Sequence, residues 1–499
     1  MRAALCTLAT VLPAIHAIHL LPRDAAVAPS VVNLDIERRS VANPAERDRL
    51  RRRQKVVEQT LDNEQTLYFC NLTLGTPDQK LRMHIDTGSS DLWVNYDDSI
   101  LCESREDPCE TGGTYDPKDS STYKFVSDDF NISYVDGSGA SGDYVTDTLK
   151  IGGATLKDFQ FGIGTQSTSK EGVLGIGYML NEVQVGRNGE KPYPNLPQAL
   201  VDAGLIRSNA YSLWLNDLSA SKGSILFGGV NTAKFEGSLH TLPIIPVARN
   251  IYAELSIALT GVALESNGET QDLTTRTLPV ATLLDSGSSL SYLPDPLVSQ
   301  IYSAVDATYD PELGAAYVPC KLGQQKASII FTFSSPSISV GMDEMVIDLG
   351  PNPDGSRPEY TNGEPACVFG IAPAGEGTSI LGDTFLRSAY VVYDLANNEI
   401  SLAKTNFNAT GDEIVEIGTG KNSVPDATGV PGAVTSADMT ATGGGPLGGP
   451  TGGGGSPTLA FSTSTGMAVP TARPEMGVGL GFGMAGWAAA GAGVVFAAM

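Results

Sequence analysis

Two short stretches of the chain carry an aspartate in almost the same setting. They read Met83-His-Ile-Asp-Thr-Gly-Ser-Ser-Asp-Leu-Trp-Val94 and Ala281-Thr-Leu-Leu-Asp-Ser-Gly-Ser-Ser-Leu-Ser-Tyr292. One Asp-Thr/Ser-Gly alone means little, because average residue frequencies give about 0.2 copies in a chain of this length. Two copies with matching flanks, 199 residues apart (285 minus 86), indicate an internal duplication with one aspartate in each half.

Two such aspartates, brought face to face, can perform acid–base chemistry on water. The glycine of each stretch allows the tight turn that points the aspartate toward its partner. Carboxylates a few ångströms apart cannot both ionise cheaply, so the pair shares one proton under acidic conditions. The ionised member can then deprotonate a water while the protonated member polarises a carbonyl. We therefore expect Asp86 and Asp285 to hydrolyse peptide bonds without a metal, a cofactor or a covalent intermediate.

The elements that position these aspartates are predicted to be β-strands. From Tyr68 to about Leu402, short β-type runs such as Leu81-Arg-Met-His-Ile85 and Tyr390-Val-Val-Tyr393 are separated by Gly, Asn, Asp and Pro. Helical patterns are few, and the clearest cover residues 196–203 and 296–305. The sequence therefore predicts a mainly β protein, and its length allows two lobes plus accessory segments.

The balance of charges excludes some classes of partner. The 499 residues include 56 acidic and 32 basic side chains, which gives a formal net charge of -24. This balance disfavours binding of nucleic acid or an anionic membrane through a basic surface. Lower pH would protonate carboxylates and relieve their mutual repulsion, which suits acidic surroundings.

Residues 66–403 resemble the pepsin-like aspartic protease family, and the resemblance extends beyond the two aspartate stretches. It implies a two-lobed fold with the active-site cleft between the lobes, here residues 54–235 and 236–405, and polypeptide substrates cut by a monomer. The first aspartate stretch matches the family's first motif, Asp86-Thr-Gly-Ser-Ser-Asp-Leu-Trp-Val94. Three further motifs occur in the family's order: the flap-like Ile132-Ser-Tyr-Val-Asp-Gly-Ser138, and the glycine stretches Gly172-Val-Leu-Gly-Ile-Gly177 and Ile380-Leu-Gly-Asp-Thr-Phe-Leu386.

The resemblance also implies a role for each site residue. Asp86 and Asp285 would form the catalytic pair. Tyr134 would close over the substrate with Trp93 supporting it, although Val135 stands where many relatives have glycine beside the flap tyrosine. The remaining residues would support the pair, the glycines by turning the chain and the hydroxyls by bracing the loops or binding the outer carboxylate oxygens: Thr87, Gly88, Ser89, Ser286, Gly287 and Ser288.

Simpler structural interpretations of the same residues are also possible. Asp285-Ser-Gly can be an ordinary turn, and Tyr134 a packed strand aromatic. Only His84 and His240 remain after removal of the predicted signal and pro-segment, which argues against a multi-histidine metal site. A serine triad would need one of them, whereas His84 is more typical of a packed or solvated strand residue. The whole chain could also be an inactive peptide-binding fold or a structural surface glycoprotein, but it has kept both aspartates, both glycines and the flap tyrosine.

The amino terminus indicates export, and export implies an oxidising compartment for the cysteines. Arg2 and the apolar run that follows it predict a signal peptide over residues 1–17, because the run is too short to span a membrane. Residues 18–53 end in an arginine-rich stretch and are interpreted as a pro-segment, or alternatively a charged linker. By resemblance, Cys102 pairs with Cys109 and Cys320 with Cys367. Cys70 is left as a buried free thiol or an intermolecular link.

The carboxyl terminus predicts a stalk and a membrane anchor. Residues 406–465 are rich in Gly, Ser, Thr and Pro and are expected to be flexible. Residues 466–499 end in an apolar, uncharged tail, the pattern of a removed GPI-attachment signal with Ser464 as the candidate site. A transmembrane span is the alternative. The order of segments resembles the yapsin-type, GPI-anchored aspartic proteases of fungi, which implies anchoring to the outer leaflet of the plasma membrane at the cell surface.

Surface features complete the prediction. The N-x-S/T sequons at Asn71, Asn131 and Asn408 are candidate glycosylation sites in an exported protein. Yapsin-type relatives prefer basic residues at the cleaved bond. The acidic stretches Asp97-Asp98 and Glu103 to Glu110 would attract such substrates if they lie near the cleft.

Overall fold

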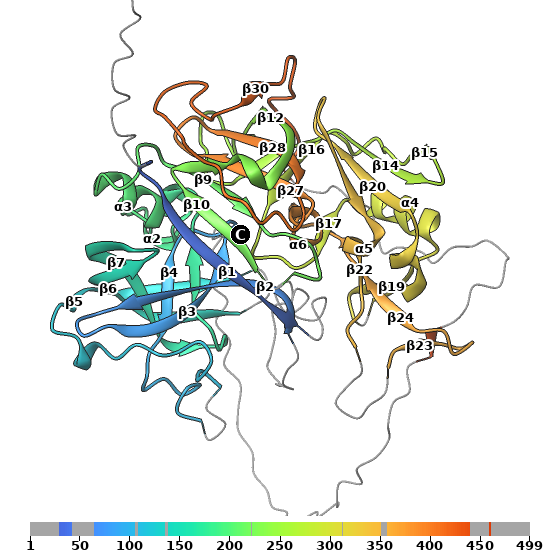
Figure 1. Ribbon diagram of the computed structural model, residues 1–499. Helices are drawn as coiled ribbons and strands as arrows, with labels where there is room; N and C mark the ends of the chain where they lie inside the picture. Colours follow the sequence, from blue (N-terminus) through green and yellow to red (C-terminus); the bar gives the residue numbers. More distant parts are fainter. Residues whose placement is uncertain are drawn as a thin grey trace, which may run out of the picture.

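The computed structural model of the chain describes residues 29–41, 64–104, 108–134, 138–220, 222–311, 313–350, 357–439 and 459–460. Within these ranges the molecule is built mainly from β-strands, with a few short helices (Figure 1). The prediction of a mainly β protein is confirmed. Both predicted helices are present, as α3 (Leu196–Asp202) and α4 (Asp295–Val305).

The amino-terminal part contains strands of 3 to 14 residues. Two helices, α2 (Val183–Asn188) and α3, pack beside them. The strands are β1 (Val32–Val41), β2 (Glu64–Leu74), β3 (Gln79–Asp86), β4 (Leu92–Asn95), β5 (Lys124–Ser133), β6 (Gly139–Ile151), β7 (Ala154–Ser167), β8 (Val173–Gly175), β9 (Ala210–Trp214), β10 (Lys222–Phe227) and β11 (Gly229–Asn231).

The carboxyl-terminal part has shorter strands and the helices α4, α5 (Met342–Met345) and α6 (Asp383–Leu386). Its strands are β12 (Phe235–Pro243), β13 (Ser256–Leu259), β14 (Gly261–Ser266), β15 (Glu269–Asp272), β16 (Val280–Leu284), β17 (Ser291–Leu293), β18 (Thr308–Asp310), β19 (Ala315–Pro319), β20 (Ala327–Thr332), β21 (Ser337–Gly341), β22 (Val346–Ile347), β23 (Glu359–Tyr360), β24 (Ala366–Phe369), β25 (Ile371–Pro373), β26 (Ser379–Leu381), β27 (Ala389–Asp394) and β28 (Glu399–Thr405). Three further strands follow: β29 (Ile414–Glu416), β30 (Ala427–Gly429) and β31 (Leu459–Ala460).

One large sheet joins the two halves of the chain. Its 14 strands run in the order β30-β12-β28-β27-β9-β10-β1-β2-β3-β8-β4-β7-β6-β5. Figure 1 shows β3 to β7 on one side of the molecule, β14 and β19 to β24 on the other, and β9, β10 and β27 between them. A separate five-stranded sheet, β13-β16-β26-β17-β25, carries the second aspartate stretch. Strands from both halves therefore meet in the middle of the molecule.

The strand pairings repeat between the two halves. Strand β3 runs parallel to β8, which in turn runs antiparallel to β4. In the second half, β16 runs parallel to β26, which runs antiparallel to β17. Each aspartate therefore lies at the end of a strand that pairs with a short strand from the glycine stretch later in its own half, β8 or β26. This repeat is what the duplicated sequence stretches predict.

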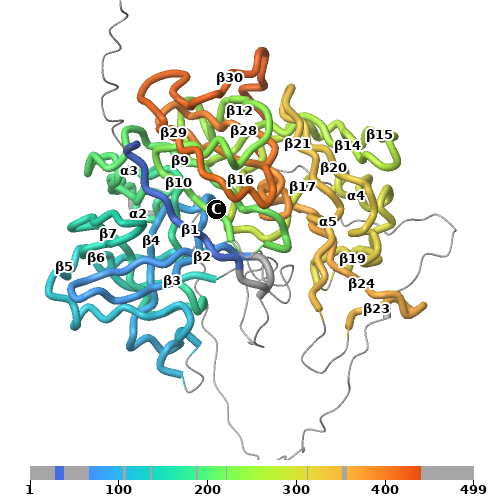
Figure 2. Tube along the Cα trace, in the orientation of Figure 1, coloured from blue at the N-terminus to red at the C-terminus, as the bar shows by residue number. Residues whose placement is uncertain are grey.

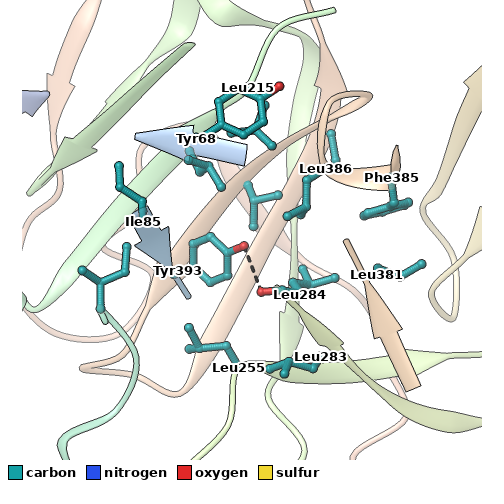
Figure 3. Packing of buried hydrophobic residues seen from close by; sticks show 14 of the residues in the cluster. Tyr68, Ile85, Leu215, Leu255, Leu283, Leu284, Leu381, Phe385, Leu386 and Tyr393 are labelled. Carbon is teal, nitrogen blue, oxygen red and sulfur yellow. Dashed lines mark hydrogen bonds between the residues drawn. The ribbon is translucent and has the colours of Figure 1, made fainter. Parts of the chain in front are cut away.

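Buried side chains from both halves form one core beneath the aspartates. Figure 3 shows Ile85 and Leu284, the residues that precede the two aspartates, close to the ring of Tyr393. Ile85 is 1% exposed and Leu284 is fully buried, and the Tyr393 hydroxyl donates a 3.3 Å hydrogen bond to the Leu284 carbonyl. Each fully buried aliphatic side chain contributes roughly 1.5–3 kcal/mol to folding. The halves are thus packed as one unit where the aspartates emerge.

The flexible stalk was predicted to begin at residue 406, but the structured part of the chain continues beyond that residue. Residues 406–439 continue from β28, form β29 and β30, and bury Ile417 and Val424 against the body. The prediction was wrong here because this segment carries spaced apolar side chains that can fill a surface groove, whereas the repetitive glycine runs begin only at Gly443. Apart from β31, the rest of the predicted stalk and the predicted GPI signal lie outside the described residues.

The amino-terminal segments are described only in part. The predicted signal peptide lies outside the described residues. Strand β1 falls within the predicted pro-segment and lies in the large sheet between β10 and β2. Among the residues that the structure describes, no helix has the length and apolar character needed to cross a membrane.

Candidate active site

The two aspartates occupy equivalent positions at the ends of two buried strands. Asp86 is the last residue of β3, and Asp285 directly follows β16. Both are buried, at 2% and 6% exposure. The structure thus brings together the two carboxylates that the sequence stretches singled out, although they are far apart in the chain.

Each carboxylate is held by the same two donors. The Gly88 amide donates to Asp86 Oδ1 at 2.8 Å and the Ser89 hydroxyl to Asp86 Oδ2 at 2.5 Å. In the second half, the Gly287 amide donates to Asp285 Oδ1 at 2.8 Å and the Ser288 hydroxyl to Asp285 Oδ2 at 2.6 Å. These hydrogen bonds fix the orientation of both carboxyl groups before any substrate arrives.

The two loops are cross-braced by the residues after each aspartate. The Thr87 hydroxyl donates to the Leu284 carbonyl at 2.8 Å, and the Ser286 hydroxyl donates to the Ile85 carbonyl at 3.1 Å. The Ser286 hydroxyl also accepts a 3.3 Å hydrogen bond from the Thr87 amide, and the Thr87 hydroxyl accepts a 3.0 Å hydrogen bond from the Ser286 amide. The four bonds make the halves dependent on each other at the site.

The glycines allow the carboxylates to approach. A Cβ added at Gly287 would lie 2.4 Å from Asp86 Oδ1 and 2.9 Å from Asp285 Oδ1. A Cβ added at Gly88 would lie 2.7 Å from Asp285 Oδ1. Both distances to the opposite aspartate are too short for a side chain. The two Oδ1 atoms therefore face each other across a space that only glycine leaves open.

The flap tyrosine is anchored to the tryptophan of the first stretch. Strands β5 and β6 pair as a hairpin, and Tyr134 directly follows β5. The Tyr134 hydroxyl accepts a 2.7 Å hydrogen bond from Trp93 Nε1. Tyr134 is 9% exposed and Trp93 fully buried, in one apolar cluster with Phe130 and Ile132. Tyr134 is thus a packed aromatic residue, and it is also hydrogen-bonded to Trp93. Val135 lies outside the described residues.

A buried acidic cluster under the hairpin escaped the sequence interpretation. Asp91 is fully buried and accepts hydrogen bonds from the hydroxyls of Tyr144 at 2.8 Å and Tyr193 at 2.9 Å and from the Val183 amide at 3.0 Å. Burial raises its pKa. Burial also raises the pKa of nearby Glu182 to about 9. The sequence could have singled out Asp91, because the equivalent position of the second stretch is the apolar Leu290.

The histidines and the free cysteine take structural positions. His84 is 3% exposed and its ring lies 5.6 Å from that of Phe69, so it is a packed strand residue. His240 is exposed on β12. Cys70 is a free thiol within this chain and is buried, and burial raises its pKa to about 12, which favours the interpretation as a buried free thiol over an intermolecular link. Both predicted disulfides, Cys102–Cys109 and Cys320–Cys367, are formed.

The acidic stretch after the first motif is partly engaged with other side chains. Asp98 forms a 2.7 Å ion pair with Lys118, whose hydrogen bond lowers the pKa of the Asp98 carboxyl. Asp97 accepts a 2.6 Å hydrogen bond from the Thr114 hydroxyl. Glu103 and Glu110 are exposed, and residues 105–107 lie outside the described residues.

The candidate modification sites differ in what can be said of them. Asn71, Asn131 and Asn408 are all exposed. A glycan on any of the three would therefore project from the surface. Ser464 lies outside the described residues.

Comparisons with known proteins agree on one family. A family model described as eukaryotic aspartyl protease matches residues 67–405. The chain is 56% identical to "Probable aspartic-type endopeptidase OPSB" of Arthroderma benhamiae, covering 99% of this chain and 98% of the relative, and 60% identical to the protein of that name from Aspergillus oryzae, covering 85% and 86%. It is 38% identical to aspartic proteinase yapsin-3 of Saccharomyces cerevisiae, covering 74% and 72%.

A solved structure agrees on the fold. The aspartic proteinase from Irpex lacteus matches with a TM-score of 0.55 at 20% sequence identity, covering 77% of this chain and 99% of that one. The predicted two-lobed pepsin-like fold is thereby confirmed.

Proposed function

Since the chain belongs to the eukaryotic aspartyl protease family and is an aspartic-type endopeptidase, we propose that Asp86 and Asp285 are its catalytic pair. The observation that carries the proposal is the matched set of hydrogen bonds: each carboxylate accepts from the glycine two residues on and the serine three residues on. An inactive peptide-binding protein would have no need of two such oriented carboxylates.

The pair works by sharing one proton. With the two Oδ1 atoms facing a common space, ionising both carboxylates is costly, so one stays protonated over an acidic range. The ionised carboxylate takes a proton from a bound water, and the water oxygen attacks the carbonyl carbon of the scissile peptide bond. The protonated carboxyl gives its proton to the carbonyl oxygen, which produces a tetrahedral diol. The carboxyl that took the proton from water then passes it to the leaving nitrogen as the C–N bond breaks, and the other carboxylate takes a proton from the diol, so the pair again holds one proton.

The hairpin of β5 and β6, with Tyr134 directly after β5, covers the bound peptide. The Tyr134 hydroxyl already accepts a 2.7 Å hydrogen bond from Trp93 Nε1, so the tyrosine ring is positioned before the substrate binds. Exclusion of water strengthens the electrostatic interactions of the pair with the substrate.

The enzyme acts outside the cell and at acidic pH. The amino-terminal apolar run and the carboxyl-terminal tail support export through the secretory pathway and attachment to the plasma membrane by a GPI anchor at Ser464. The exposed sequon asparagines fit glycosylation of an exported protein, and the two disulfides fit an oxidising compartment.

Basic side chains are preferred at the cleaved bond. Support comes from the acidic loop between Cys102 and Cys109 and its flank. Because Asp98 is already paired with Lys118, the attraction rests on the other acids of this region, Glu103, Glu106, Asp107 and Glu110.

The function is tested with the purified chain and a denatured protein substrate. Cleavage should be fastest at acidic pH and unchanged by chelators, because the shared-proton pair needs no metal. A rate that is greatest above neutrality, or loss of activity with a chelator, would contradict the proposal.

A further inference from the structure

The chain continues as an ordered segment after the family match ends at residue 405. Residues 406–439, which we call the strap, cross the molecule from β11 past β12 to β16, and Figure 2 shows this path in orange and red. The strap therefore touches elements of both lobes in succession.

The strap is first fixed to the amino lobe. Its strand β29 pairs antiparallel with β11. The Asn231 side-chain amide donates to Asp412 Oδ1 at 2.9 Å, and Lys234 Nζ donates to the Ala409 carbonyl at 2.8 Å. Lys234 is 7% exposed and its ammonium lies 4.3 Å from the centre of the Trp214 ring. A buried lysine with these contacts is a strong attachment point.

The middle of the strap adds to the central sheet. Strand β30 pairs in parallel with β12 and becomes the edge strand of the large sheet. Ile417 is fully buried and Val424 is 6% exposed, in a cluster that includes Trp214 and Tyr390. The strap thus covers apolar surface that would otherwise face water.

The end of the strap lies against the strand that carries the second aspartate. The Val434 amide donates to the Ser334 hydroxyl at 3.0 Å. Ala437 and Met439 pack against an apolar cluster of Ile245, Ala258 and Ala281. The Asp438 carbonyl accepts a 2.9 Å hydrogen bond from the Ala281 amide, in a bridge between Asp438 and Val280.

This bridge fills a gap in the pairing of β16. On one side β13 pairs with β16 from Val280 to Leu283, whereas on the other side β26 pairs only from Thr282 onward. Asp438 takes the position beside Val280 and Ala281 that β26 does not reach. Without it the Ala281 amide would lose its acceptor at the start of β16, the strand directly before Asp285.

We propose that the strap is a positioning element of the active site, which ties the two lobes together and fixes the strand that presents Asp285. This role rests on the proposed pairing of Asp86 with Asp285. It extends the catalytic body to residue 439, and the tether to the membrane begins only after that point.

The test compares two substitutions in the full-length chain. Ala437→Asp places a carboxylate against the apolar cluster, and Ser436→Asp adds the same charge at the exposed neighbouring position. We expect Ala437→Asp to lower kcat by about tenfold, because small displacements of a reacting group are costly, with KM changed less than twofold. Ser436→Asp should leave both constants unchanged. Hydrogen exchange should accelerate at the Ala281 amide in Ala437→Asp alone.

A second variant keeps the test decisive if Ala437→Asp does not fold. Met439→Ala removes packing without adding charge and should lower kcat severalfold, while Met439→Leu should restore it. The proposal is overturned if kcat stays within twofold in the variants that fold, or if lost activity only follows the unfolded fraction. An Asp285→Asn control separates the two claims: activity in that control refutes the catalytic pair, whatever the strap variants do.

Discussion

At the scale of single residues, the site depends on hydroxyl groups that serve both halves at once. Thr87 and Ser286 each donate to a backbone carbonyl of the opposite stretch and accept from each other's amide. Replacing one hydroxyl leaves buried partners unsatisfied, whereas replacing both removes a shared network. The brace is therefore expected to behave as one unit.

We predict that Thr87→Val and Ser286→Ala each lower the free energy of unfolding by about 1–3 kcal/mol. The double variant should lose less than the sum, because the residues share hydrogen bonds. Urea denaturation of the four proteins measures this directly. Additive losses would mean that the two hydroxyls act independently.

The buried carboxyl of Glu182 predicts a pH dependence of stability. Burial raises its pKa in the folded protein from 4.5 to about 9. The folded state therefore holds the proton of the Glu182 carboxyl more tightly than the unfolded state does. The contribution of this proton to the free energy of unfolding is full below about pH 4.5 and is lost as pH rises toward 9. The slope for one proton is at most about 1.4 kcal/mol per pH unit.

Glu182→Gln should flatten this pH dependence, since an amide carries no charge at any of these pH values and can still accept from the Tyr193 amide. Denaturant unfolding between pH 5 and pH 8 provides the measurement, in steps of about one unit. Glu190→Gln, at an exposed position of the same segment, is the matched control and should change nothing. An equally steep dependence in Glu182→Gln would assign it to other groups, such as Asp91.

At the scale of elements, the acidic loop is expected to set specificity. We predict that the combined change Glu103→Gln, Glu106→Gln, Asp107→Asn and Glu110→Gln reduces kcat/KM for substrates with Lys or Arg at the cleaved bond, because the attracting charges are lost. Raised salt should have a similar effect on the unsubstituted enzyme. Cleavage of a peptide library measures both.

A control for this loop comes from the hairpin of β14 and β15. Neutralising its exposed Glu265, Glu269 and Asp272 in the same way should leave the preference intact. If the unsubstituted enzyme shows no basic preference, or if the loop variant keeps it, the loop has no role in specificity.

The sequence predicted some elements well, for physical reasons. Duplicated motifs and alternating apolar runs are local patterns, so the strands before Asp86 and Asp285 and the helices α3 and α4 could be located. The strap could not be located from the sequence, because its apolar residues are sparse and their burial depends on the surface that they cover. Asp91 was missed for a similar reason: its partners Tyr144 and Tyr193 are distant in the chain.

At the scale of the whole molecule, the proposed arrangement is a two-lobed body held at the cell surface by the chain after residue 439. We predict that the full-length protein fractionates with membranes and is released by a phosphatidylinositol-specific phospholipase C, because a GPI anchor is held only by its lipid. Protein that is extracted only by detergent would support the transmembrane alternative instead.

The central claim is that Asp86 and Asp285 act together on one water. The most direct measurement is the activity of Asp86→Asn and Asp285→Asn, each checked for folding by thermal unfolding, on a peptide substrate at acidic pH. Because an amide cannot exchange the shared proton, each variant should lose essentially all activity while keeping the fold. A correctly folded variant of either kind that keeps more than a trace of activity would contradict the account.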